Sequence, residues 1–156
     1  MNVLVCDDER QIVDSIIETL EKKTEETQVS SRFYGFSQPS QIDLSLPYDI
    51  ALLDIDMGET NGIELARKLR EENENIVIVF ITNFIQYAPE GFEVQAFRYL
   101  LKSDLPAKLY SYFDSAVHEA LQRKQLVTIS INSEIIDVPV NDILYLESHR
   151  RIIAMH

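Results

Sequence analysis

Short apolar runs bounded by polar residues recur through the first two thirds of the chain. The clearest of them, at 50–56, places four apolar residues in a row before Asp54. Four apolar residues are too few for the face of an amphipathic helix and are typical of a strand that is buried on both sides. Four more strands are predicted from similar runs, at 3–6, 29–36, 76–81 and 98–101.

Between these runs the apolar residues follow a helical period. They recur every three or four positions from residue 10 to Leu20, and again after Asn61 and after Asp104, two residues suited to cap a helix. Two further helices are predicted to be short or broken, at 37–46 and 84–97. Strands and helices alternate in this way up to residue 124, so the sequence predicts an α/β fold with a doubly wound parallel sheet.

The pattern changes after residue 125. Val127, Ile129 and Ile131 alternate with polar residues, which is typical of strands with one solvated face. Further short strands are predicted at 135–140 and 143–147. We therefore expect a domain at 1–122, followed at 123–156 by a linker and a partial β segment.

Composition narrows the possible functions. The chain has 156 residues and a formal net charge of -12, which argues against a nucleic-acid surface spread over the whole molecule. Its single cysteine, Cys6, cannot form an internal disulfide, and the chain contains no apolar run near the roughly 20 residues that span a bilayer. With no basic leader before the first strand, we expect a cytoplasmic protein without a membrane partner.

Charged and polar side chains follow four of the predicted strands. Asp7 and Asp8 follow the first, Asp54 the third, Thr82 the fourth and Lys102 the fifth. The carboxyl ends of parallel strands meet at one edge of a doubly wound sheet, so these groups are expected to converge. Clustered carboxylates repel one another, and a hard cation such as Mg²⁺ would neutralise their charge. A lysine and a hydroxyl are suited to bind a phosphoryl anion. Asp54 is then a carboxylate that can form an acyl phosphate.

With these motifs, residues 1–122 resemble the receiver domain of bacterial two-component response regulators. The resemblance rests on the order of six residues, Asp7, Asp8, Asp54, Thr82, Tyr99 and Lys102. It implies a flavodoxin-like five-stranded parallel sheet of order 2-1-3-4-5. It also implies that Asp54 takes a phosphoryl group from a phosphohistidine on a sensor histidine kinase. Such a protein is not an enzyme beyond its self-catalysed phosphoryl transfer and autodephosphorylation.

The resemblance also implies a metal site. Mg²⁺ would be held by Asp8, Asp54 and the backbone carbonyl of Asp56, with Asp7 acting through water. Its place beside Asp54 would let the metal assist phosphoryl transfer to that carboxylate.

Three further roles come from the resemblance alone. Lys102 would pair with the phosphoryl oxygens as charge develops. Thr82 would turn toward the phosphoryl group, and Tyr99 would follow it inward and alter the surface nearby.

The stretch 87–102 resembles the subgroup of receivers that are joined to LytTR DNA-binding domains, and 135–148 looks like the opening strands of such a domain. The resemblance places His149, Arg150 and Arg151 in a loop that would contact DNA. Residues 126–156 are too few for the whole domain, so we expect a homodimer or a poorly ordered tail and weak DNA binding. Control of transcription would need the complete C-terminal domain.

Two alternative functions stay open from the sequence alone. Asp54 and Asp56 could be the nucleophile and the acid of a haloacid-dehalogenase-like phosphatase, although that pair usually follows the first strand. The chain could also be a receiver that signals through protein contacts without DNA.

Overall fold

A five-stranded parallel sheet forms the centre of the computed structural model, which describes residues 1–25, 30–58, 60–84, 86, 88–131, 134–139, 146–149 and 152–155. The strand order is β2-β1-β3-β6-β7, and every pairing in this sheet is parallel. The strands are β1 (Asn2–Cys6), β2 (Arg32–Phe36), β3 (Ile50–Leu53), β6 (Val77–Thr82) and β7 (Arg98–Leu101). This order is the predicted 2-1-3-4-5 arrangement, so the predicted fold class is confirmed.

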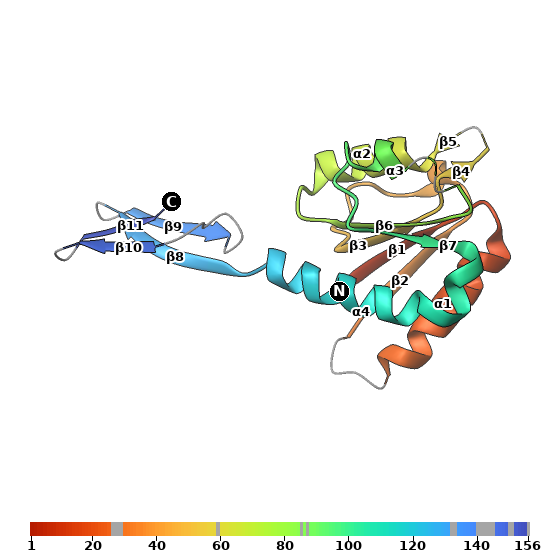
Figure 1. Ribbon diagram of the computed structural model, residues 1–156, viewed down its shortest axis with the longest axis horizontal. Helices are drawn as coiled ribbons and strands as arrows, with labels where there is room; N and C mark the ends of the chain where they lie inside the picture. The colour runs from red at the N-terminus through yellow and green to blue at the C-terminus, as the bar shows by residue number, and fades with distance from the viewer. Residues whose placement is uncertain are drawn as a thin grey trace.

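Helices cover both faces of the sheet. They are α1 (Arg10–Thr24), α2 (Gly62–Glu72), α3 (Ala88–Gly91) and α4 (Leu105–Arg123). Figure 1 shows α1 and α4 on one side of the sheet and α2 and α3 on the other. The apolar core is divided in the same way, with one cluster under α1 and α4 and a second under α2.

The two clusters explain why the strands are unbroken apolar runs in the sequence. In β1, Val3 and Val5 belong to the cluster under α1 and α4, while Leu4 and Cys6 belong to the cluster under α2. Successive side chains of a strand point to opposite faces, so a strand that is covered on both sides must be apolar at every position.

The helix predicted at 37–46 is wrong. The structure has only a 3₁₀ turn there, η1 (Pro39–Gln41). Proline at the start of the turn and the side chain of Asp43, which accepts hydrogen bonds from the backbone N–H (3.0 Å) and the hydroxyl (2.7 Å) of Ser45, favour a local turn over a helix. The helix predicted at 84–97 is broken as expected, and among the described residues of this stretch α3 is the α-helical part.

The predicted caps have different outcomes. Asn61 caps α2, because its Oδ1 accepts a hydrogen bond from the backbone N–H of Ile63 at 2.8 Å. Asp104 precedes α4 but makes no capping bond, because its Oδ2 accepts a hydrogen bond from Lys108 Nζ at 2.7 Å. A hairpin that the sequence did not predict, β4 (Asp56–Met57) and β5 (Thr60–Asn61), lies between β3 and α2.

Strands follow α4, as the change of period predicted, and they form antiparallel hairpins. β8 (Leu126–Ile131) pairs with β9 (Glu134–Pro139), and β10 (Leu146–His149) pairs with β11 (Ile152–Met155). Residues 140–145, which include most of the strand predicted at 143–147, lie outside the described residues. Among the helices that the structure describes, none is long and apolar enough to cross a bilayer.

Arg70, in the last turn of α2, joins two loops to the helix. Its Nη1 donates to the carbonyl oxygens of Glu74 (2.6 Å) and Ile76 (2.7 Å). Its Nη2 donates to those of Val94 and Gln95, both at 3.1 Å. These carbonyls belong to the loop before β6 and the segment before β7, so one side chain holds both segments against α2.

Arg70→Met is expected to lower the free energy of unfolding by about 2 kcal/mol, because four carbonyl groups would lose a bond from a charged donor. Two of them, those of Ile76 and Val94, are partly buried, and Ile76 would keep a bond from Arg123. Urea denaturation would measure the loss. Arg67→Met is the matched control, since Arg67 lies on the same helix and forms an exposed ion pair with Glu93 at 3.3 Å. Equal unfolding midpoints for the two variants would contradict the role given to Arg70.

Candidate functional site

Three of the predicted site residues meet at the carboxyl edge of the sheet. Asp7 follows β1, Asp54 follows β3, and Lys102 follows β7. Lys102 Nζ lies 2.8 Å from Asp7 Oδ2 and 2.7 Å from Asp54 Oδ2. Both carboxylates are buried, and the lysine side chain is only 10% exposed. One ammonium group therefore bridges two buried carboxylates that are far apart in the sequence.

Backbone groups fix the direction of both carboxylates. Asp54 Oδ1 accepts a hydrogen bond from the N–H of Ile55 at 2.6 Å, and Asp7 Oδ1 accepts one from the N–H of Glu9 at 2.9 Å. The N–H of Asp54 donates to the carbonyl oxygen of Cys6 at 2.9 Å, which ties the end of β3 to the end of β1. Each carboxylate thus keeps one oxygen on the backbone and turns the other toward the lysine.

Glu9 joins this group, although it was not predicted. Its Oε1 lies 3.4 Å from Lys102 Nζ on the solvent side, and its side chain is mostly exposed. The carboxylates of Asp7, Asp8 and Glu9 offer oxygens that lie within 4.8 Å of one another. In the sequence, the only signal that Glu9 belongs to this site is its position directly after Asp7 and Asp8. Asp56, in β4, is exposed.

The charges of the site shift the pKa of its members. Burial alone would lower the pKa of Lys102, but hydrogen bonds and charges from Asp54 and Asp7 outweigh burial and raise it, so the ammonium stays protonated. Burial raises the pKa of Asp7 against the opposing effects of Lys102 and the N–H of Glu9. Burial, followed by the charges of neighbouring aspartates, raises the pKa of Cys6 to about 12, which leaves an unreactive thiol.

The raised pKa of Asp7 predicts a gain of stability on its removal. The folded protein binds the Asp7 proton more tightly than the unfolded chain does, so ionisation of Asp7 costs folding free energy. That cost grows as the pH rises from the ordinary value of 3.8 through the raised one. Asp7→Asn is therefore expected to stabilise the metal-free protein at pH 7, and to stabilise it less as the pH falls toward 4.

Urea denaturation in EDTA at several pH values would test this expectation. Asp14→Asn is the control, because Asp14 forms an exposed ion pair with Arg10 at 2.9 Å and should change stability little at any pH. A lower stability of Asp7→Asn than of the native protein at pH 7 would contradict it.

The two residues with predicted switch roles lie on adjacent strands. Thr82 ends β6 and is buried, and its Oγ1 accepts a hydrogen bond from the backbone N–H of Phe84 at 3.2 Å. Tyr99, in β7, is half-buried and stands opposite Phe80 in the strand register, with ring centroids 5.2 Å apart. The structure thus places Thr82 at the same edge as the acidic site and Tyr99 on the cluster under α2.

Gly62, at the start of α2, packs against the backbone of Asp54. A Cβ at position 62 would lie 1.8 Å from the carbonyl oxygen of Asp54. The N–H of Gly62 donates to the carbonyl oxygen of Ile55 at 2.8 Å. No sequence pattern predicted this role of Gly62, because the contact between α2 and the end of β3 is visible only in three dimensions.

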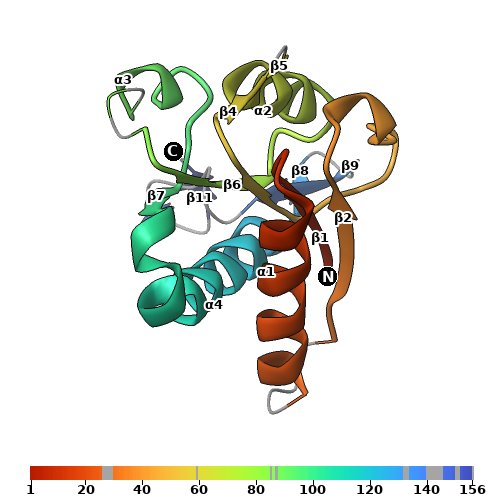
Figure 2. The same cartoon turned by 90° about the vertical axis from the view of Figure 1, so that its right-hand side faces the viewer.

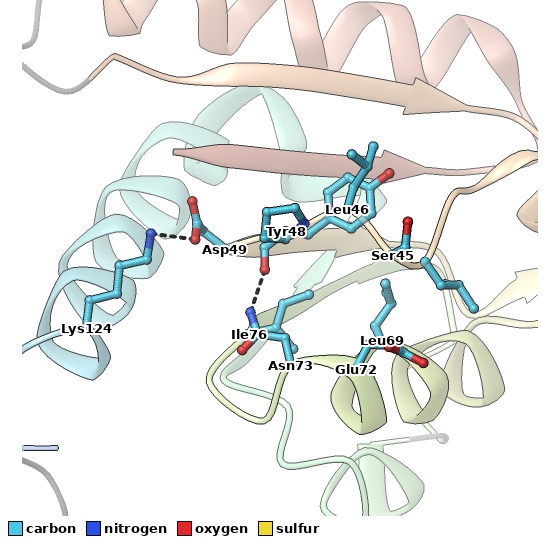
Figure 3. Close-up of a pocket in the computed structure, with 11 residues that line it drawn as sticks. Ser45, Leu46, Tyr48, Asp49, Leu69, Glu72, Asn73, Ile76 and Lys124 are labelled. Carbon is cyan, nitrogen blue, oxygen red and sulfur yellow. Dashed lines mark hydrogen bonds and ion pairs between the residues drawn. The ribbon is translucent and has the colours of Figure 1, made fainter. Parts of the chain in front are cut away.

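A cavity of about 350 Å³ lies at the opposite edge of the sheet, where β3 and β6 begin (Figure 3). Three of its polar side chains, those of Lys124, Asp49 and Asn73, have partners. Lys124 Nζ lies 2.6 Å from Asp49 Oδ1, and Asn73 Nδ2 donates to the carbonyl oxygen of Tyr48 at 2.9 Å. The cavity is separated from Asp54 by the length of the strands, so the chemistry of the acidic site does not involve it.

The predicted DNA contacts are only partly within the described residues. His149 ends β10, where it is paired with Ile152 in the strand register. Arg150 and Arg151 lie outside the described residues. Their contact with DNA stays a prediction.

Comparison with known sequences gives the family. Residues 3–114 match the response regulator receiver domain. The sensory transduction protein LytT of Bacillus subtilis (strain 168) is 28% identical over 155 residues, which cover 93% of this chain and 64% of LytT. The transcriptional regulatory protein YpdB of Escherichia coli (strain K12) is 31% identical over 116 residues, which cover 66% of this chain and 48% of YpdB. The chain thus spans less than two thirds of the length of these relatives.

Solved structures support the fold. The BeF3-activated receiver domain of DrrB has a TM-score of 0.65 at 19% identity, over 75% of this chain and 97% of that one. TrrA from Thermotoga maritima, in complex with Mg(2+)-BeF, has a TM-score of 0.62 at 23% identity, over 74% of this chain and 97% of that one. With the sequence match, these structures lead to one conclusion: the chain belongs to the response regulator receiver domain family, and it contains the receiver domain of a two-component response regulator.

Proposed function

We propose that Asp54 is the residue that accepts the phosphoryl group, from a phosphohistidine on a sensor histidine kinase. The observation that carries the proposal is the contact of Lys102 Nζ with the buried carboxylates of both Asp7 and Asp54. In the transfer a bond forms between an Asp54 carboxylate oxygen and phosphorus. The bond from phosphorus to the imidazole nitrogen breaks, and that nitrogen keeps the electron pair. Lys102 is placed to stabilise the phosphoryl oxygens as the bond forms.

The residues around Asp54 fit a divalent cation. The oxygens of Asp7, Asp8 and Glu9 lie within 4.8 Å of one another, and hard oxygen donors of this kind suit Mg²⁺. We assign the metal to Asp7, Asp8, Asp54 and the backbone carbonyl of Asp56. When bound, Mg²⁺ would neutralise charge between these carboxylates and the incoming phosphoryl oxygens. TrrA, which was solved in complex with Mg(2+)-BeF, supports Mg²⁺ as the metal.

Thr82 and Tyr99 would change position when Asp54 is phosphorylated. Thr82 Oγ1 accepts a bond from the N–H of Phe84, and a rotation about χ1 would let the hydroxyl donate to a phosphoryl oxygen instead. Tyr99 would then take the space that the threonine leaves, and the surface formed by α3 and β7 would change.

We propose that the phosphorylated receiver controls transcription through a LytTR DNA-binding domain. Residues 123–156 would form the first part of that domain. LytT and YpdB, a sensory transduction protein and a transcriptional regulator, support this output, as do the antiparallel hairpins after α4. A homodimer in the cytoplasm, bound to DNA through the complete C-terminal domain, is the expected active form. A receiver that acts through protein contacts alone would leave these hairpins unexplained. The family match does not favour a phosphatase built on Asp54 and Asp56.

Incubation with Mg²⁺ and acetyl phosphate, followed by intact mass measurement, tests the proposal. The native protein is expected to gain one adduct of about 80 Da, and Asp54→Asn none. Asp56→Asn is the matched control and should still form the adduct, because the substitution keeps the backbone carbonyl group at position 56. An adduct that persists in Asp54→Asn, or no adduct on the folded native protein, would rule the proposal out.

A further inference from the structure

Gly91, the last residue of α3, lies directly against the tip of the Tyr99 side chain. A Cβ at position 91 would lie 1.4 Å from Tyr99 Oη and 2.5 Å from its Cζ. Real Cβ atoms essentially never approach other atoms within 3.0 Å, so no residue with a side chain fits at position 91 while Tyr99 is in place. Figure 2 shows α3 above the end of the sheet where β6 and β7 lie.

A second neighbour, Phe80, bounds the tyrosine ring. Phe80, at the centre of β6, is fully buried, and its ring lies 5.2 Å from that of Tyr99 with 33° between the planes. The ring of Phe80 and the backbone of Gly91 together form a seat for the tyrosine, which we call the Tyr99 seat. Burial, with the nearby charge of Glu90 as a second cause, raises the pKa of Tyr99, in keeping with a hydroxyl that is withdrawn from water.

The backbone that forms the seat is held in place from both sides. The carbonyl oxygen of Gly91 accepts a hydrogen bond from the N–H of Ala96 at 3.0 Å, which closes the turn between α3 and β7. Arg70 donates to the carbonyls of Val94 and Gln95 in the same turn, and Val94 is buried. A conflict between a side chain at 91 and the tyrosine would therefore displace the tyrosine more readily than the turn.

We propose that Gly91 is the residue that admits Tyr99 to the Tyr99 seat, the position it occupies before phosphorylation, and that any side chain at position 91 would keep the tyrosine outside the seat. The inference rests on the proposed switch role of Tyr99 and adds a positioning residue to it. It follows that Gly91→Ala changes the α3 and β7 surface without phosphorylation, in a protein whose acidic site is intact.

The test observes Tyr99 directly by NMR, in protein with ¹³C at the tyrosine Cζ. The chain has seven tyrosines, so the Tyr99 signal is assigned from its loss in Tyr99→Phe. In Gly91→Ala the signal is expected to shift, and the pKa read from its titration should fall from the raised value to the ordinary value of about 10. A folded Gly91→Ala protein with an unchanged Tyr99 signal and pKa would overturn the proposal.

Gly35→Ala is the matched control. A Cβ at Gly35 would also be crowded, but by the side chains of Ile17 and Val13 on α1. It should leave the Tyr99 signal unchanged, and a Tyr99 shift in this variant equal to that of Gly91→Ala would count against a specific seat.

A second variant keeps the test decisive if Gly91→Ala does not fold. The double variant Gly91→Ala, Tyr99→Leu lacks the clashing atoms of the tyrosine. It should fold with a urea midpoint at or above that of Tyr99→Leu alone, because alanine favours a helix over glycine. Failure of Tyr99→Leu to restore the fold would overturn the proposal. All these measurements use protein without a phosphoryl donor, so their outcome is independent of the mass measurement on Asp54.

Discussion

Lys102→Met is expected to slow the transfer of a phosphoryl group to Asp54 by about 100- to 1,000-fold, the loss that follows removal of one preorganised charged group from a transition state. Lys102 Nζ is already 2.7 Å from Asp54 Oδ2, and its side chain is 10% exposed, so little reorganisation is needed when the phosphoryl oxygens arrive. Its raised pKa keeps the charge in place throughout the neutral range. The rate at which the adduct of Asp54 appears with acetyl phosphate and Mg²⁺ measures the effect.

Lys108→Met provides the control for this rate. Lys108 is also a lysine near the start of α4, but it is half exposed and pairs with Asp104 one turn earlier at 2.7 Å. Its removal should leave the rate unchanged. If Lys102→Met kept the native rate within a factor of ten while its fold was intact, the lysine would not act on the phosphoryl group.

The convergence of Asp7, Asp54 and Lys102 followed from local rules. Each residue comes directly after an apolar strand, and the carboxyl ends of parallel strands share one edge of the sheet. The sequence pattern therefore placed the three groups together, and the structure adds the distances. Their roles in phosphoryl transfer were inferred from the resemblance to receivers, and the mass and rate measurements described above test these roles.

Other features depend on contacts between segments that no local pattern contains. Glu9 is an exposed residue before a helix. Its proximity to Lys102 depends on the lysine side chain, which starts at the end of β7 and reaches the end of β1, although β3 and β6 lie between these two strands. Gly91 lies in the stretch 84–97, for which the sequence predicted only a short or broken helix, while its contact with Tyr99 arises from the turn between α3 and β7. The helix predicted at 37–46 failed for another reason, since its apolar residues pack on the core without helical hydrogen bonds.

Gly62→Ala is expected to lower the free energy of unfolding by about 4 kcal/mol or more, a loss in the exceptional range for one methyl group. The new Cβ would lie 1.8 Å from the carbonyl oxygen of Asp54, 2.9 Å from its carbonyl carbon and 3.0 Å from the Cα of Ile55. All three are backbone atoms, so no rotamer change can relieve the clash. Moving α2 away would break the bond from the N–H of Gly62 to the carbonyl of Ile55.

Urea denaturation of Gly62→Ala beside Gly58→Ala separates this clash from the general cost of replacing a glycine. Gly58 has φ of +74° and no atoms within 4 Å of its would-be Cβ, so alanine there should cost only the 1 to 2 kcal/mol, roughly, of a left-handed backbone. Asp54→Ala should not rescue Gly62→Ala, because the obstructing atoms belong to the backbone. A Gly62→Ala protein within 1 kcal/mol, approximately, of the native stability would show that α2 can move from the end of β3. Position 62 would then have no part in placing Asp54.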